Sequence, residues 1–495
     1  MSTAIGTMNS FCRSSPCENV KLVVSSALVT LLIFVLIIGV SLTWCVLKIH
    51  PAANFLLLIG AITLLAYVEA LHYACVAIEK WDMDQYKERF PRAVKCHALV
   101  DTPDKVKKFL VGRQFFVIFV VFLIAQITSF EGLPSILVLI FIQTGLPGIA
   151  LTLNVGQLIS QIYVEEFTLQ FMNIYGCEFV IRLSLFAEWI GICNFSWLLY
   201  GVVSRIACKK VRRIQKTLDA DNLRSTDDLN EPTSPHTANR GPDFDTGLTR
   251  KEPLTLFDYA KYIWSTAVTL GSVVVVLYGI SIEAYVLPIP AGAAYIVALI
   301  LLTTLYYLEG LMIAIVGTQY WDPETFRTVY PRAYKVHAMM SEPDNVKRFI
   351  IGRQFFTLLT NFFLAQILVF ANWKSGSYNP VLFFLVIKSG LVGVMIILAF
   401  AQLLPELLAA EFPLRFMNMY GSGAICNMCM VFDAIGVGHF AWALYFVTRK
   451  MICGSQMSGD TVVEGTKPTL VIVASAEVLA KTKKLAVRNP DHSTV

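Results

Sequence analysis

The sequence predicts an all-α polytopic membrane protein with about ten transmembrane helices in two five-helix inverted repeats. Its composition indicates the membrane, because 56% of the residues are hydrophobic and only 15% are charged, whereas about a quarter are charged in a soluble domain. An internal repeat indicates the two halves. Residues 69–127 align without a gap with residues 309–367, and about 26 of these 59 positions are identical.

Each half contains five apolar runs of about 20 residues, which is long enough to cross a bilayer core of roughly 30 Å. In chain order the runs are residues 22–46, 54–78, 109–130, 133–158, 179–204, 262–286, 289–317, 349–371, 380–404 and 424–447. Because five is an odd number of crossings, the second half would enter the membrane from the opposite face, which makes the halves inverted. A sixth crossing hidden within residues 156–178 would instead make them parallel.

Polar stretches divide the chain. The predicted division is a polar N-terminal tail at 1–20, a first five-helix repeat at 21–208, a disordered polar linker at 209–258, a second five-helix repeat at 259–450 and a polar C-terminal tail at 451–495. The linker has the low hydrophobicity typical of disorder. The halves also match beyond their most similar part, because Gln157, Glu166 and Tyr200 recur at an offset of 245 as Gln402, Glu411 and Tyr445.

Two signals for membrane orientation disagree. The positive-inside rule places the basic cluster at 209–216 in the cytosol, which with ten spans puts both termini outside. The C-terminal Ser493-Thr494-Val495 has the form of a ligand for cytosolic PDZ domains, which puts the termini inside. We expect cytosolic termini, a PDZ-domain partner and a multi-pass protein of the plasma membrane. The net charge of +5 is small, and its basic residues lie beside span ends, so we expect no nucleic-acid partner.

Glu69 and Glu309 lie deep within matching apolar runs. A charge at such depth costs about 2.5–3.5 kcal/mol of insertion free energy, so two charges at matching positions indicate a functional or structural role that offsets this cost. Each acid could coordinate a cation, accept a proton or orient a substrate-binding helix. Alternatively, each could form a structural ion pair with Arg113 or Arg353 on the next predicted helix.

A Gly-Arg-Gln triplet begins that next helix in both halves, at 112–114 and 352–354. Gly112 and Gly352 would let a ligand or another backbone come close. Gln114 and Gln354 each offer two donors and an acceptor, which suits an uncharged solute with several hydroxyl groups. Arg113 and Arg353 could instead extend toward the headgroups, as cations near helix ends do.

His72 and Met312 follow the buried acids by three residues and so share a helix face with them. His72 could face the transport pathway, or it could be a packed histidine bonded to Glu69. Scattered amides such as Gln157 and Gln402 are expected to join helices to each other. No metal-ligand spacing and no nucleophile–base pair is visible, so we expect neither a metal centre nor an enzyme.

The pattern of a buried Glu on one helix and Gly-Arg-Gln-Phe-Phe on the next, present twice, resembles the diatom-type silicon transporters. The resemblance covers nearly all of residues 21–450. The family carries Glu-Gly-x-Gln at the buried acid. This chain reads Glu69-Ala70-Leu71-His72 and Glu309-Gly310-Leu311-Met312, so the Gln is absent from both copies and the Gly from the first.

The resemblance implies a secondary active transporter of silicic acid, or of a similar small neutral hydroxylated solute, coupled to sodium and working by alternating access. Gln114, Gln354, His72, Met312 and the two triplet glycines would contact the solute. Glu69 and Glu309, with their arginines, would hold the ion or brace the site. The alternatives are a sodium-independent channel or uniporter for a neutral solute, and a membrane scaffold that transports nothing.

Overall fold

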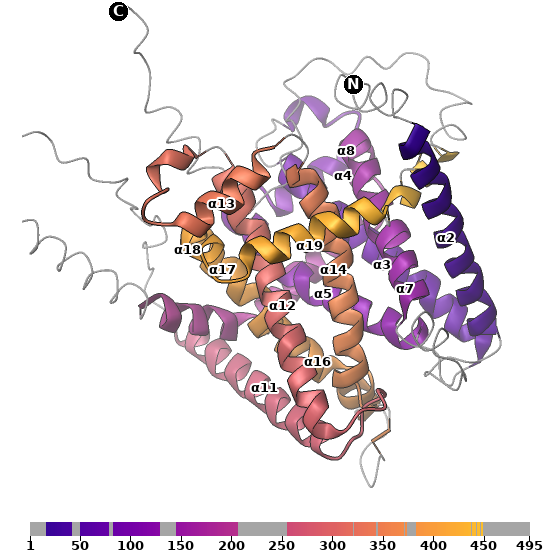
Figure 1. The fold of residues 1–495 in the computed structure, drawn as a ribbon, viewed down its shortest axis with the longest axis vertical. Coiled ribbons are helices and arrows are strands. Elements are labelled where there is room, and N and C mark those ends of the chain that lie inside the picture. The colour runs from indigo at the N-terminus through magenta and orange to yellow at the C-terminus, as the bar shows by residue number, and fades with distance from the viewer. Residues whose placement is uncertain are drawn as a thin grey trace, which may run out of the picture.

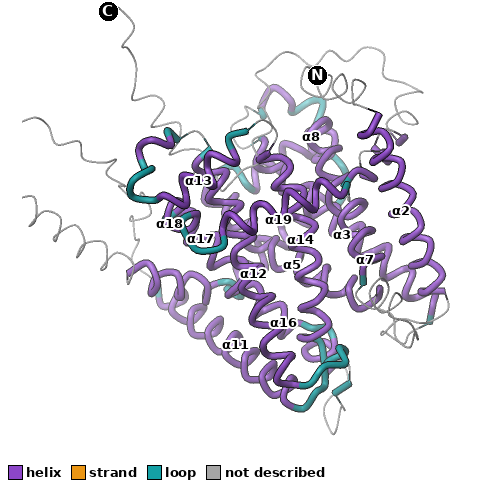
Figure 2. Tube along the Cα trace, viewed as in Figure 1, coloured by secondary structure: helices purple, strands orange, loops and turns teal. Residues whose placement is uncertain are grey.

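The computed structural model describes residues 16–41, 50–78, 83–128, 145–205, 255–319, 321–342, 345–370, 372–373, 383–436, 438–441, 443–445 and 447–448. These residues form helices and the turns between them, with no strand among them (Figure 2). Most of the predicted linker and C-terminal tail, including Ser493-Thr494-Val495, lies outside the described residues.

The described part of the first half is a series of helices. They are α2 Pro16–Ser41, α3 Pro51–Ala77, η1 Asp84–Tyr86, α4 Pro91–Leu99, α5 Pro103–Thr128, α7 Leu146–Leu151, η3 Thr152–Leu158, α8 Ile159–Met172 and α9 Cys177–Trp189. The segment η3 is a π-helix that continues α7 into α8 without a break.

Among the described residues, the second half repeats the order of this series, with one additional π-helix, η5, and with α17 and α18 in place of α8 (Figure 1). Its members are α11 Leu256–Ser281, α12 Ala291–Thr318, η4 Pro323–Thr325, α13 Pro331–Met340, α14 Asn345–Leu368, η5 Phe384–Lys388, α16 Leu391–Ile396, η6 Ile397–Leu403, α17 Leu404–Glu411, α18 Pro413–Met417 and α19 Ser422–Ile435. A π-helix, η6, joins α16 to α17, as η3 joins α7 to α8 in the first half. The repeat seen in the sequence is therefore a repeat of structure.

Six of the described helices are long and apolar enough to cross a membrane, or up to eight if each of two bent pairs counts as one span. The bent pairs are the predicted fifth helices. Cys177–Trp189 and Asn194–Arg205 meet at 56°, and Ser422–Ile435 and His439–Tyr445 meet at 45°. Ten spans are therefore not confirmed. Each fifth apolar run breaks into a bent pair, either a broken span or a re-entrant loop. Two further predicted runs, those in α14 and in the helix formed by α7, η3 and α8, are not among the candidates even when both pairs are counted, because polar side chains such as Arg353 and Gln157 lower their hydropathy.

The two halves run in the same direction. Along α5, Gln114 bonds to Gln402, whereas Phe122, two turns further on, contacts Gly393 earlier in the opposing helix. Along α14, Arg353 lies within electrostatic range of Glu406 in α17, and Leu368 at the other end packs on the same Gly393. Both long helices are thus antiparallel to the helix formed by α16, η6 and α17.

It follows that α5 and α14 are parallel to each other, and Figure 1 shows α2 and α11 descending in the same sense as well. The predicted inverted arrangement is not confirmed. Two halves whose matching helices point the same way are related by an axis along those helices, as in parallel repeats.

Contacts between the halves come in reciprocal pairs. Phe122 packs on Gly390, and its counterpart Phe362 packs on Gly145. The backbone N–H of Ala441 donates to Asn154 Oδ1 at 3.0 Å, while Ser196 donates to the backbone oxygen of Ala399 at 3.4 Å. Likewise, the Tyr200 hydroxyl donates to Glu411 and the Tyr445 hydroxyl donates to Glu166. The halves therefore meet through a local two-fold relation.

Candidate functional site

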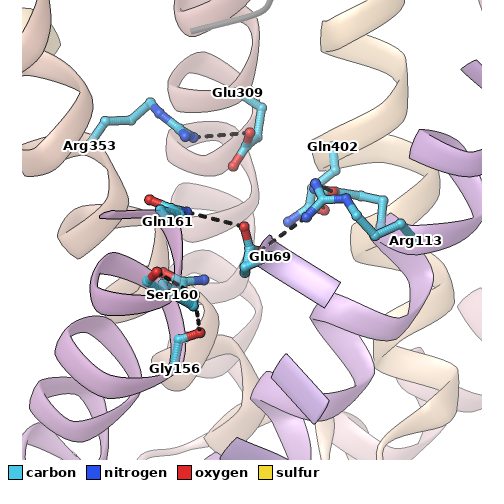
Figure 3. Close-up of polar contacts among 10 residues, drawn as sticks. Glu69, Arg113, Gly156, Ser160, Gln161, Glu309, Arg353 and Gln402 are labelled. Carbon is cyan, nitrogen blue, oxygen red and sulfur yellow. Dashed lines mark hydrogen bonds and ion pairs between the residues drawn. The ribbon is translucent and has the colours of Figure 1, made fainter. Parts of the chain in front are cut away.

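Two buried ion pairs lie where the halves meet (Figure 3). Arg113 Nη1 lies 3.2 Å from Glu69 Oε1, and both side chains are 8% exposed. Arg353 Nη1 lies 3.1 Å from Glu309 Oε2, with side chains 11% and 5% exposed. Each pair joins the second and third long helices of its own half. The matching acids and arginines predicted from the sequence are thus brought together within each half.

Each buried acid also has a second polar neighbour. Gln161 Nε2 in α8 donates to Glu69 Oε2 at 3.3 Å, and the Thr357 hydroxyl in α14 donates to Glu309 Oε1 at 3.4 Å. At the position matching Gln161, offset by 245, the second half has Glu406 in α17. One half therefore has a neutral amide where the other has a third carboxylate.

The two ion pairs and Glu406 form one central charge cluster. Glu406 lies within electrostatic range of Glu309, Arg113 and Arg353, and His72 lies within range of both arginines. We use the name central charge cluster for the set Glu69, Arg113, Glu309, Arg353 and Glu406. With all three carboxylates ionised, its two guanidinium groups leave it a formal charge of −1 between the halves.

The triplet glycines fit helix packing. A Cβ added to Gly112 would lie 1.8 Å from the backbone oxygen of Ser184 in α9, and one added to Gly352 would lie 1.7 Å from that of Cys429 in α19. Because only hydrogen fits there, these glycines let the third helix of each half press against the backbone of the fifth. They place the adjacent arginine and glutamine at the interface between halves.

The triplet glutamines are buried, each 8% exposed. Gln114 Oε1 accepts a hydrogen bond from Arg113 Nη2 at 2.9 Å, and Gln114 Nε2 donates to Gln402 Oε1 in the other half at 2.5 Å. Gln354 forms no side-chain hydrogen bond among the described residues. The matching triplet glutamines therefore differ: Gln114 is hydrogen-bonded to the other half, and within the described residues Gln354 is not.

The remaining predicted site residues lie next to this cluster. His72 is partly buried on α3, and its ring lies 5.3 Å from that of Tyr73. Met312 packs against the apolar core of the second half. Within the part of the chain that the structure describes, no group of three or more His, Cys, Asp or Glu side chains is arranged to hold a metal ion.

Sequence reasoning missed Gln161 and Glu406 altogether and treated Gln402 as a link between helices. Gln161 and Glu406 lie at matching positions but differ in residue type, so the alignment at an offset of 245 would have drawn attention to them. Gln402 does link helices, but it links one half to the other half's triplet glutamine.

Comparison with known proteins gives one family. The family model described as silicon transporter matches residues 13–220 and 253–472, which is most of the chain and includes both halves. No curated protein and no solved structure matches.

Proposed function

The chain belongs to the silicon transporter family, and we propose that it carries silicic acid, or a similar small neutral hydroxylated solute, across the plasma membrane with sodium. The observation that carries the proposal is the central charge cluster with buried amides beside it, between two halves of a membrane protein. Charges and amides at such depth are costly and mark a solute or ion path.

The amides suit a neutral hydroxylated solute. Silicic acid is a small tetrahedral molecule with four hydroxyl groups and no charge at neutral pH. A glutamine side chain can donate to such a hydroxyl and accept from it. Gln114 and Gln354 supply this chemistry, His72 can replace a missing glutamine as donor or acceptor, and Met312 cannot donate.

The charge balance supports coupling to a cation. The central charge cluster has one carboxylate more than it has guanidinium groups, so a bound Na⁺ would neutralise it when all three carboxylates are ionised. Inward movement of one positive charge gains about 2.3 kcal/mol per 100 mV of membrane potential, which a neutral solute alone cannot gain. Glu309 and Glu406, whose carboxylates interact electrostatically, are the groups we assign to the cation.

Alternating access would follow from movement of one half against the other. Parallel repeats move as rigid bodies around a site held between them. The reciprocal Tyr200–Glu411 and Tyr445–Glu166 hydrogen bonds join the halves, and such bonds must break and form again as the site opens to each side.

Uptake into proteoliposomes tests the proposal. Radiolabelled germanic acid serves as the tracer, unlabelled silicic acid competes, and borate and urea serve as other neutral solutes. We expect uptake that an inward sodium gradient stimulates and that silicic acid inhibits. The Glu406→Gln variant should lose the sodium stimulation. Uptake that silicic acid does not inhibit would refute the substrate, and uptake indifferent to sodium in the unaltered protein would favour a uniporter or channel.

A further inference from the structure

Gln157 and Gln402 occupy matching positions in matching π-helices. Gln157 lies in η3 and Gln402 in η6, and the two side chains are 5% and 2% exposed. A π-helical turn widens a helix locally and occurs frequently at functional sites. Two such turns, each carrying a buried glutamine at the interface between halves, form a feature that the triplet motif does not include.

The two glutamines differ in their hydrogen bonds. Gln402 Oε1 accepts from Gln114 Nε2 across the interface at 2.5 Å. Gln157 Oε1 is buried and has no hydrogen-bond partner in the part of the chain that the structure describes. By the repeat, Gln157 corresponds to Gln402 and Gln354 corresponds to Gln114, and among the described residues no hydrogen bond joins this second pair of amides.

The surrounding contacts hold both pairs in equivalent places. Phe122 with Gly390 and Phe362 with Gly145 pack the halves on one side of the glutamines, in the same way in each half. Three residues before each glutamine, at Asn154 and Ala399, the π-helix bonds to the fifth helix of the other half. The frame is therefore symmetric, and the difference lies in the amides themselves.

A buried acceptor without a partner is costly, so a site that contains one favours a ligand that donates to it. A hydroxyl group between Gln157 and Gln354 would donate to Gln157 Oε1 and accept from the Gln354 amide. A solute without an O–H group, such as a fully deprotonated oxyanion, has no proton to donate, so the pair would select hydroxylated solutes. A site built to bond a hydroxyl rejects an analogue without one by a large factor.

We propose that Gln157 and Gln402 are substrate ligands in addition to the triplet glutamines, with Gln157 and Gln354 forming the open hydroxyl-binding pair. The direct Gln114–Gln402 bond is the same pair in its closed state. This assignment rests on the proposed transport of a hydroxylated solute. It makes the binding site a cross-interface structure, in which each half supplies one amide from its third helix and one from a π-helix.

The test compares Gln157→Met and Gln402→Met with the control Gln126→Met. Gln126 in α5 is equally buried, at 3% exposure, and its Nε2 also lacks a hydrogen-bond partner among the residues that the structure describes, but it lies twelve residues beyond the triplet glutamine. Uptake of germanic acid gives KM for each variant. The thermal unfolding temperature of the purified protein, with and without silicic acid, gives binding independently of transport.

We expect Gln157→Met to raise KM about tenfold or more and to lose the stabilisation by silicic acid, while its unfolding temperature without silicic acid does not fall. Gln402→Met should raise KM as well, and Gln126→Met should leave KM unchanged. A Gln157→Met protein with unaltered KM and ligand stabilisation would overturn the assignment and leave the proposed function standing. An unaltered protein that neither transports silicic acid nor is stabilised by it would overturn both.

Discussion

Removing an arginine from the central charge cluster should cost more stability than removing an acid. The formal charge of the cluster is −1, so Glu309→Gln brings it to zero, whereas Arg353→Gln brings it to −2. The Arg353 and Glu309 side chains are 11% and 5% exposed, which leaves little water to screen the excess charge. Leaving a buried charge unpaired costs about 3–5 kcal/mol, and we expect that cost for Arg353→Gln.

Glu309→Gln should cost about 1–3 kcal/mol, because Glu406 still lies within range of the Arg353 guanidinium and the chief loss is one hydrogen-bonded acceptor. The double variant Glu309→Gln/Arg353→Gln should be less destabilised than the sum of the singles, as expected for contacting residues. Reversible unfolding of the purified protein in detergent measures all three. Equal costs for the two single variants, or strictly additive costs, would show that the charges do not share one low-dielectric cluster.

Three further changes test other parts of the structure. Gly352→Ala should destabilise the protein by about 1–3 kcal/mol or more, because its Cβ would lie 1.7 Å from the Cys429 backbone oxygen. Gly60→Ala, whose Cβ would meet no described atom within 4 Å, should be neutral or stabilising in the same unfolding assay. Tyr445→Phe removes a hydrogen bond to the Glu166 carboxylate and should cost about 1.5–3 kcal/mol, with a similar loss for Tyr200→Phe; unchanged unfolding in both would contradict a joint between the halves. Sodium should raise the unfolding temperature of the unaltered protein and not that of Glu406→Gln, since a ligand stabilises only a protein that binds it; equal stabilisation would remove Glu406 from the cation site.

The sequence was sufficient to predict the class of protein and to anticipate the two buried ion pairs at its centre. The family resemblance, drawn from two Gly-Arg-Gln triplets and two buried acids, is confirmed by the family match. Acids that deep in lipid need partners, and the arginines at matching places within the next apolar helix of each half were Arg113 and Arg353, so the ion pairs could be anticipated as one of two alternatives.

The arrangement of the halves could not be read from apolar runs. The run at 179–204 is long enough to cross a bilayer, but the structure bends it by 56° after Trp189, where Gly191 adopts a positive φ of 83°. Hydropathy does not detect such a bend, and one bend changes the parity of crossings in a half. The pairing of Gln114 with Gln402 was also invisible, because the two residues are 288 positions apart and only the packing of the halves joins them.

Basic residues support halves that point the same way. The connectors that follow the second helix of each half, at 79–108 and 318–348, contain eight and five Lys or Arg residues. The connectors at the opposite end of the helices, at 42–50, 129–145, 282–290 and 369–390, contain one, none, none and two. With inverted halves, the two basic connectors would lie on opposite sides of the membrane and would favour opposite orientations. With parallel halves they all lie on one side, as the positive-inside rule requires.

The same arrangement removes the conflict over orientation. If each half makes an even number of crossings, its bent fifth helix being re-entrant, then both termini, the basic stretch at 209–216 and the two basic connectors share the cytosolic side. Single cysteines at the exposed, matching positions Glu88 and Thr328 test this with a membrane-impermeant maleimide. We expect both to be protected in intact cells and labelled after permeabilisation, with Ser281→Cys, at the opposite end of α11, labelled from outside. Labelling of Glu88→Cys and Thr328→Cys from opposite sides of the membrane would support the inverted arrangement. In that arrangement α5 and α14 would be antiparallel, which contradicts the contacts of Gln114 and Phe122 with the second half.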